Sequence, residues 1–208
     1  MSTQLQPEDV ERLEQCLAAG GVAVFPSDTV YGLCCDPDNE RAAQRLYELK
    51  GRPAARPAAV MFFALEQALA ALPELPDRER HALQALLPGP VTLLLANHAK
   101  RFAPACRTDP ATLGLRVPRL PPALLALGCF AGAIMQSSAN LSGQADARSL
   151  DEVPDSVLVG ADLVLDGGKL PGRPSTVVDL RDYDASHRWH VLREGALSGA
   201  DVQRMLAC

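Results

Sequence analysis

The chain has 208 residues, of which 48% are hydrophobic, so it is long and apolar enough to bury a substantial core in one domain. Its formal net charge of -5 argues against a surface that is basic overall and leaves only a local basic cleft as a route to nucleic acid. Residues 1–10 lack the basic and apolar regions of a secretory signal, and no apolar run approaches the roughly 20 residues of a membrane helix. We therefore expect a soluble, cytoplasmic protein with no membrane partner.

Two patterns predict the secondary structure. Short, wholly apolar runs between turn residues are typical of strands covered on both faces, and apolar residues at helical spacing beside caps indicate helices. In chain order we expect a helix at 7–18, a strand at 22–25, a helix from a cap at Asp38 or Asn39 to Lys50, a strand at 60–63, short helix and turn at 65–76, a helix at 77–87, strands at 91–95 and 113–117, a short helix at 121–127, strands at 133–135, 163–165, 176–180 and 189–192, and a C-terminal helix capped by Ser198.

A further capping box is expected between Ser149 and Glu152. Strands and helices alternate along most of the chain, which predicts an α/β fold with one central sheet. No repeat, low-complexity tract or linker interrupts the pattern. We expect residues 1–208 to form a single domain.

Familiar cofactor and metal motifs are missing. The sequence has no Gly-x-x-x-x-Gly-Lys-Ser/Thr loop, no Gly-x-Gly-x-x-Gly and no Gly-x-Ser-x-Gly. Its four histidines and six cysteines show no metal-ligand spacing, so we expect reduced thiols and no metal site of the protein's own. Any nucleotide would be held by cationic side chains and hydroxyl groups at strand ends.

Polar residues at strand ends are the strongest candidates for a site. Open α/β sheets bind ligands beyond the carboxyl ends of their strands, so folding should bring several such clusters to one rim of the sheet. Guanidinium and ammonium groups suit phosphate and carboxylate, and hydroxyl groups orient neutral polar groups. The clusters are Ser27-Asp-Thr29 with Tyr31, Thr112 with Arg116, Ser137-Ser-Ala-Asn140 and Ser175-Thr176, and the accompanying cations are Lys50, Arg52, Arg56, Arg173 and Arg193.

Each cluster also has a structural interpretation. Hydroxyl residues after a strand commonly form turns, and Lys50 at a helix C-terminus complements the helix dipole. Arg116 is a stronger candidate, because a charge inside an apolar strand needs an anionic partner or a ligand cavity. From the residues alone, a ligand contact and a structural ion pair are equally good explanations of Arg116.

Seven blocks, in order, resemble the YrdC-like threonylcarbamoyl-AMP synthase family, and they span about residues 22–195. A single block carries little weight, but seven in register are highly specific. The blocks are Pro26-Ser-Asp-Thr-Val-Tyr-Gly-Leu33, Tyr47-Glu-Leu-Lys-Gly-Arg-Pro53, Pro88-Gly-Pro-Val-Thr92, Leu115-Arg-Val-Pro118, Ser138-Ala-Asn-Leu-Ser-Gly143, Ser175-Thr-Val-Val-Asp179 and Leu192-Arg-Glu-Gly195.

The resemblance implies a twisted mixed parallel and antiparallel sheet, flanked by helices, with a positively charged concave cleft. It implies that L-threonine, bicarbonate and ATP give threonylcarbamoyl-AMP and pyrophosphate, with Mg²⁺ carried by ATP. The product would pass to the machinery that makes threonylcarbamoyladenosine beside the anticodon of tRNA.

The resemblance also implies roles for individual residues. The family's Lys-x-Arg and Ser-x-Asn signature falls on Lys50, Arg52, Ser138 and Asn140, which are the expected catalytic residues. By position, threonine would be held by Thr29, Arg116 and Ser175, and the nucleotide by Arg52, Arg56, Thr112, Ser138 and Arg193.

The chain departs from the family pattern around the proposed small-molecule pocket. Cys34 and Cys35 stand where a glycine usually follows, Met61 replaces a histidine of some members, and Gln136 replaces a small residue or proline. We expect the two cysteines to add side chains beside the threonine pocket. These changes bear on the identity of the amino-acid substrate.

Two other functions remain open. One is a synthase of a different carbamoyl adenylate, which a comparison of amino acids in pyrophosphate release would separate. The other is a non-catalytic YrdC-like protein that binds double-stranded RNA or tRNA on its cationic face. Retention of all four signature residues and the acidic pI of about 5.4 favour the enzyme, whereas steep salt dependence of RNA binding would favour the second function.

Overall fold

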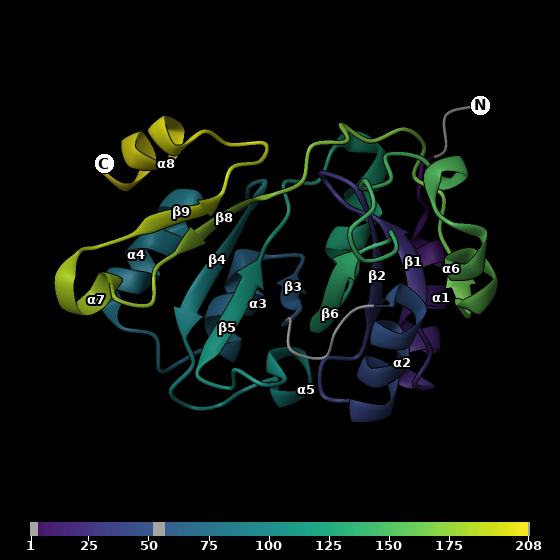
Figure 1. The fold of residues 1–208 in the computed structure, drawn as a ribbon, viewed down its shortest axis with the longest axis horizontal. Helices are drawn as coiled ribbons and strands as arrows, with labels where there is room; N and C mark the ends of the chain where they lie inside the picture. Colours follow the sequence, from purple (N-terminus) through teal and green to yellow (C-terminus); the bar gives the residue numbers. More distant parts are fainter. Residues whose placement is uncertain (1–3, 52–56, 208) are drawn as a thin grey trace.

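Nine strands form one mixed sheet in the order β7-β1-β2-β6-β3-β5-β4-β8-β9 in the computed structural model, which describes residues 4–51 and 57–207. Figure 1 shows the sheet running across the molecule, with β3 near its middle, between β6 and β5. The mixed sheet confirms the predicted fold class. The strands are β1 (Ala23–Pro26), β2 (Tyr31–Cys35), β3 (Ala59–Phe62), β4 (Val91–Ala96), β5 (Thr112–Arg116), β6 (Ala133–Ser138), β7 (Leu163–Val164), β8 (Thr176–Asp179) and β9 (His190–Arg193).

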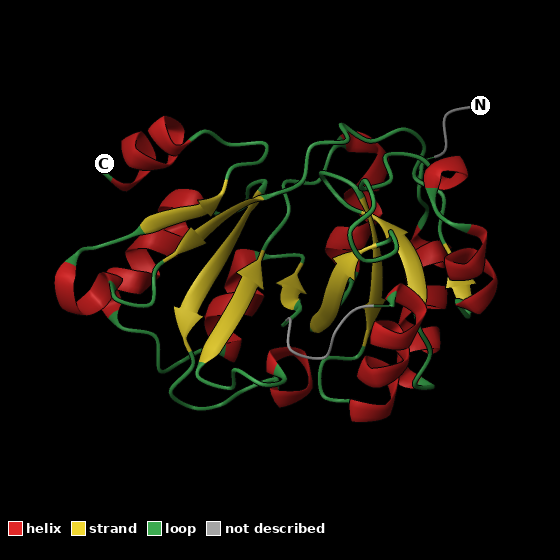
Figure 2. Cartoon of the chain, viewed as in Figure 1, coloured by secondary structure: helices red, strands yellow, loops and turns green. Residues whose placement is uncertain are grey.

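Helices flank both ends of this sheet, as the cartoon in Figure 2 shows. No helix within the described residues is long and apolar enough to cross a membrane. The helices are α1 (Pro7–Ala18), α2 (Glu40–Lys50), α3 (Leu65–Ala71), α4 (Asp77–Leu86), α5 (Ala103–Cys106), α6 (Asp155–Gly160), α7 (Tyr183–Ser186) and α8 (Gly199–Leu206), with 3₁₀ helices η1 (Pro122–Cys129) and η2 (Leu150–Glu152).

The helices with clear caps were predicted correctly. The side chain of Asn39 accepts a hydrogen bond from the backbone of Ala42 at 3.0 Å at the start of α2. Gly51 ends that helix in the left-handed region at φ 57°, where a side chain would be strained. Ser198 caps α8 through the backbone of Asp201, as expected.

Two expectations for secondary structure were wrong. Strand β2 was missed, because its five buried residues follow a polar turn and do not alternate. The short helix expected at 121–127 is present as 3₁₀ helix η1. The capping box is not formed, because Ser149 makes no side-chain capping bond and Glu152 instead accepts from the backbone of Arg148 at 2.9 Å.

Strand β2 explains the backbone of the opening motif. It pairs antiparallel with β1 and with β6, so residues 27–30 are the turn of a hairpin in the interior of the sheet. Gly32 is required there, since a Cβ atom at this position would lie 2.7 Å from Cε1 of Phe25. The hairpin therefore holds Thr29 next to the strands that carry the other candidate residues.

Strand register brings small residues together on one face of the sheet. Gln136 of β6 pairs with Ala59 of β3, Ala59 pairs with Gly114 of β5, and Gly114 pairs with Leu94 of β4. Directly paired residues project to the same face of a sheet. Ala59 and Gly114 leave the middle of this row open between the larger side chains of Gln136 and Leu94.

Candidate functional site

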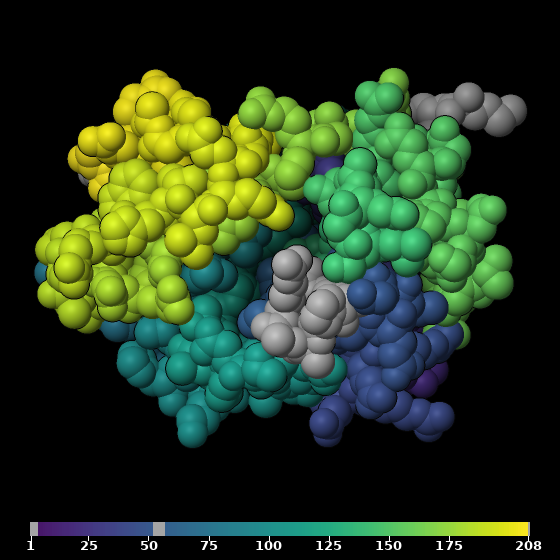
Figure 3. All heavy atoms as spheres, viewed as in Figure 1, coloured from purple at the N-terminus to yellow at the C-terminus, as the bar shows by residue number. Residues whose placement is uncertain are grey.

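A cavity of about 360 Å³ lies over that open row, and its walls come from strands and loops far apart in the sequence. Figure 3 shows the molecule hollowed near the middle of this face, between the yellow C-terminal segments and the green segment that follows β6. The cavity is lined by Thr29, Val30, Pro57, Ala58, Ala59, Thr92, Leu94, Asp109, Thr112, Gly114, Arg116, Gln136, Ser137, Ser138, Asp146, Pro174, Ser175, Val177, Arg181 and Arg193.

Arg116 provides a buried guanidinium group at one end of the cavity. Its Nη2 donates to Oδ1 of Asp28 at 2.8 Å and to the hydroxyl of Thr29 at 3.3 Å. Nε has no hydrogen-bond partner among the described residues, although Arg116 is only 3% exposed. A buried donor that lines a cavity and lacks a partner is suited to an anionic ligand group.

The ion pair of Arg116 with Asp28 combines two opposing effects. Burial lowers the pKa of Arg116, and the charge of Asp28 raises it in part. Burial likewise raises the pKa of Asp28, while Arg116 and the backbone amide of Arg119 lower it. Because desolvation is the largest effect for both groups, the pair is better explained by positioning of Arg116 than by stabilisation of the fold.

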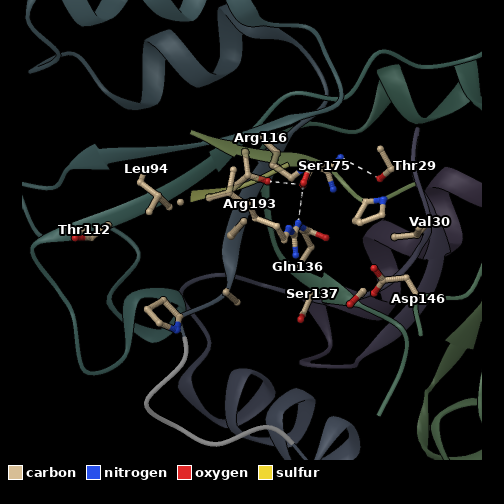
Figure 4. A pocket seen from close by; sticks show the side chains of 18 of the residues that line it. Thr29, Val30, Leu94, Thr112, Arg116, Gln136, Ser137, Asp146, Ser175 and Arg193 are labelled. Atoms are coloured by element: carbon tan, nitrogen blue, oxygen red, sulfur yellow. Dashed lines mark hydrogen bonds between the residues drawn. The ribbon is translucent and has the colours of Figure 1, made fainter. Parts of the chain in front are cut away.

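Hydroxyl groups line the wall formed by β4 and β8. The hydroxyls of Thr92 and Ser175 lie 2.8 Å apart, and Nη2 of Arg193 donates to the Ser175 carbonyl at 2.8 Å. Figure 4 shows Arg116, Ser175, Arg193 and Gln136 pointing toward the same space. This wall presents a hydroxyl and a second guanidinium group to a ligand held by Arg116.

Lys50 and the Ser138-Ala-Asn140 turn form one hydrogen-bonded unit at the other end of the cavity. The ammonium group of Lys50 donates to Oδ1 of Asn140 at 2.6 Å and to the hydroxyl of Ser138 at 3.1 Å, and also to both backbone carbonyls. Ser138 in turn donates to Oδ1 of Asn140 at 2.6 Å. Lys50 is 3% exposed and lies behind the turn, so it fixes the position of Ser138.

Charged groups of both signs complete the lining. Nη1 of Arg181 donates to the Thr112 hydroxyl at 3.3 Å and its Nη2 pairs with Asp179 at 2.6 Å. Asp109 and Asp146 also line the cavity, as do Arg116 and Arg193. The described part of the wall therefore carries three arginines and two aspartates.

The structure brings the four predicted polar clusters together. Six predicted site residues line the cavity, namely Thr29, Thr112, Arg116, Ser138, Ser175 and Arg193. Two others, Lys50 and Asn140, contact Ser138 from behind the wall. Arg52 and Arg56 lie outside the described residues. The catalytic and ligand-binding roles of all ten stay predictions.

Several residues of this site were not identified as site residues from the sequence. Asp28 belongs to a quoted block but received no role, and its burial beside Arg116 depends on the hairpin turn. Thr92 lies in an apolar strand, where a single hydroxyl is the available signal. Tyr31 was grouped with Thr29, but its hydroxyl donates to Asp166 at 3.0 Å, and Tyr31 is absent from the described lining.

The chain's departures from the family pattern do not all reach the cavity. Cys34 and Cys35 are buried in the core as free thiols, and neither is among the described lining residues, although Cys34 lies opposite Gln136 on the neighbouring strand. Met61 is also fully buried away from the described lining. Gln136 is different, because it lines the cavity.

A family model described as telomere recombination, which covers the Sua5, YciO and YrdC proteins, matches residues 15–195. The threonylcarbamoyl-AMP synthase of Halorhodospira halophila is 37% identical over 170 residues, which cover 79% of this chain and 86% of that protein. The threonylcarbamoyl-AMP synthase of Pyrococcus abyssi is 30% identical over 189 residues, which cover 90% of this chain and 54% of that protein. The chain therefore spans about half the length of the second relative.

Solved structures give the same picture of the fold. P. abyssi Sua5 complexed with L-threonine has a TM-score of 0.83 and 27% identity, and the match covers 97% of this chain and 58% of that one. E. coli YciO has a TM-score of 0.80 and 25% identity, with 95% of this chain and 94% of that one covered. A similar mixed sheet thus occurs in a relative that spans most of the same length and in a longer one.

Proposed function

This chain belongs to the Sua5/YciO/YrdC family, and from that premise we propose that it is a threonylcarbamoyl-AMP synthase. Its substrates are L-threonine, bicarbonate and ATP, which enters as its Mg²⁺ complex. The observation that carries the proposal is one cavity with an N–H of Arg116 at one end that has no partner among the described residues, and with the Ser138 turn at the other end. Relatives named for this activity and a Sua5 structure with L-threonine support it.

The reaction requires two anionic groups to meet. The threonine nitrogen forms a bond to the carbon of bicarbonate or of the CO₂ derived from it, and loses a proton, which gives a carbamate. A carbamate oxygen then attacks the α-phosphorus of ATP, and the bond to the bridging oxygen breaks to release pyrophosphate. Counted from bicarbonate, one water is also released. Holding both reactants in one cavity removes much of the entropic barrier to this step.

We assign threonine to the end of the cavity where the buried guanidinium group of Arg116 lies. The carboxylate of threonine accepts hydrogen bonds from Arg116, with Thr29 and Ser175 beside it. Asp28 keeps the guanidinium group in place through its 2.8 Å bond. We assign the nucleotide to the side of Ser138, where Arg52 and Arg56 follow Lys50 in the chain. Arg193, which donates to the Ser175 carbonyl, lies beside the threonine and reaches the nucleotide from there.

Cations near the phosphates stabilise the charge on departing pyrophosphate. In this proposal Lys50 acts partly through Ser138 and Asn140, which it holds in the turn. The labile product is passed to the proteins that modify adenosine beside the anticodon of tRNA, which places the reaction in the cytoplasm. Weak binding of tRNA to the same face is compatible with this role.

The test measures pyrophosphate release from ATP, bicarbonate and one amino acid at a time, with mass analysis of the product. We expect release to require threonine and the product mass to be that of threonylcarbamoyl-AMP. Ser175→Ala should lower turnover with threonine, while Ser186→Ala, an exposed serine on α7, is the matched control. Release that is independent of threonine, or fastest with another amino acid, would contradict the proposal.

A further inference from the structure

Gln136 is the departure from the family pattern that reaches the cavity. It lies in the interior of β6, is 8% exposed, and lines the wall. Its side-chain amide makes no hydrogen bond within residues 4–51 and 57–207. The amide atoms are not sealed in the core but open into the cavity, where a bound molecule can exchange hydrogen bonds with them. The side chain is therefore suited to contact a ligand.

The position of Gln136 in the sheet indicates which part of the ligand it meets. On β6 it stands two residues from Ser138, and through Ala59 it is in register with Gly114, two residues from Arg116. Two residues of a strand span about 6.6 Å. Gln136 therefore lies in the row between the carboxylate-binding end and the Ser138 end of the cavity.

The floor beside Gln136 leaves room for a reacting group. Ala59 contributes one methyl group and Gly114 contributes none, so the space between Gln136 and Leu94 is open at the level of the strands. In the proposed function, a threonine bound through its carboxylate at Arg116 has its nitrogen on the side of this space. Figure 4 shows the Gln136 side chain beside Arg193 on this side of the cavity.

We propose that Gln136 is a further substrate-contacting residue, whose amide holds the carbamate formed on the threonine nitrogen. This inference rests on the proposed function. The amide N–H donates to one carbamate oxygen, and the amide carbonyl accepts from the carbamate N–H. The other carbamate oxygen is left to attack the α-phosphorus near Ser138. One neutral amide thus orients the anion while adding no charge of its own.

The test separates the carbamate from threonine itself. Gln136→Ala should lower kcat/KM for bicarbonate by about 10-fold to 100-fold, the range expected for a hydrogen bond to a charged group. The Kd for threonine, measured by calorimetry without bicarbonate, should stay within about twofold. Gln136→Glu should lose more than Gln136→Ala, because a carboxylate repels the carbamate.

Two further variants control for packing and for general effects. Gln136→Met keeps the length of the side chain and removes its hydrogen bonds, so it should be impaired as strongly as Gln136→Ala. Gln203→Ala makes the same change on the exposed face of α8 and should behave as wild type. Thermal unfolding checks that each variant is folded.

Several results would overturn the inference. The first is an unchanged kcat/KM for bicarbonate in Gln136→Ala, and the second is a wild-type kcat/KM in Gln136→Met. The third is a weaker threonine Kd that accounts for the entire loss of activity, because Gln136 would then contact threonine itself and not the carbamate. Failure of the proposed function looks different, because wild type itself would then release no pyrophosphate with threonine and bicarbonate.

Discussion

Glu79 on α4 is a buried carboxyl group whose removal should stabilise the protein in a pH-dependent way. It is 2% exposed, and its Oε2 has no hydrogen-bond partner in the described structure. Burial and the charge of Asp184 on α7 raise the pKa of Glu79 to about 7. Helix α4 packs against α7 and α8, so this charge lies under the segment that joins β8 to β9.

The sign of the effect follows from proton binding. In the unfolded chain the carboxyl titrates near 4.5, and in the folded protein near 7, so the folded state binds the proton more tightly. The associated stability is fully present below pH 4.5 and is lost as pH rises through about 7. The difference between the two pKa values, 4.5 and about 7, corresponds to about 3 kcal/mol in the free energy of unfolding at about 1.36 kcal/mol per pKa unit.

The perturbation is Glu79→Gln, which keeps the shape of the protonated carboxyl and cannot ionise. Urea unfolding at pH 8 should give a free energy of unfolding up to about 3 kcal/mol higher than wild type, and the difference should vanish near pH 4.5. Glu66→Gln, at an exposed position of α3, should change it by no more than about 0.5 kcal/mol at either pH. A Glu79→Gln difference that is independent of pH, or negative at pH 8, would refute the reasoning.

Three other substitutions test the hairpin, the cavity wall and the Arg116 pair. Asp28→Asn should weaken threonine binding about tenfold by calorimetry. It should also lower the free energy of unfolding by about 3–5 kcal/mol, because the buried charge of Arg116 loses its counter-ion, and unchanged affinity would count against positioning of the arginine by this carboxylate. Gly195→Ala places a Cβ on the chain's own backbone at Ser175 and should lower the free energy of unfolding by about 2–4 kcal/mol, as measured by thermal unfolding. The control is Gly128→Ala, which should be tolerated because the nearest atom to its Cβ lies at 3.8 Å. Similar melting temperatures of the two variants would contradict this. Tyr31→Phe removes a buried hydroxyl that bonds to residues 166–168 and should cost about 1–3 kcal/mol in urea unfolding, and a neutral result would show that these bonds contribute nothing.

The parts of the fold that the sequence predicted are those specified by local chemistry. Helix α1 has the predicted bounds because a proline at its start and glycines after its end mark both termini. Strands such as β4 are short apolar runs between turns, and their bounds differ from the prediction by about a residue. Strand β2 was missed although it forms a local hairpin with β1, because its residues neither alternate nor form a wholly apolar run.

The candidate site divides in the same way. Residues at strand ends could be predicted to gather because strand ends share a rim, and Thr29, Thr112, Ser138 and Ser175 do line one cavity. Which side chains line the cavity depends on register and on the position of the strand in the sheet. Cys34 lies directly opposite Gln136, yet only Gln136 lines the cavity, because β6 and not β2 adjoins the open row at Ala59.

Three residues of the Lys-x-Arg and Ser-x-Asn signature, Lys50, Ser138 and Asn140, form one hydrogen-bonded unit. Lys50 ends α2 and contacts a turn 88 residues later, where its ammonium group binds two carbonyls and two side-chain oxygens. Hydrogen bonds from a charged donor contribute about 1.5–3 kcal/mol each when both partners are buried. A neutral residue at this position would therefore release Ser138 from the cavity wall before any effect on the nucleotide arises. Because Lys50 and Ser138 are coupled in this way, loss of activity in Lys50→Ala and Ser138→Ala should be far from additive, as expected for residues that act as one unit.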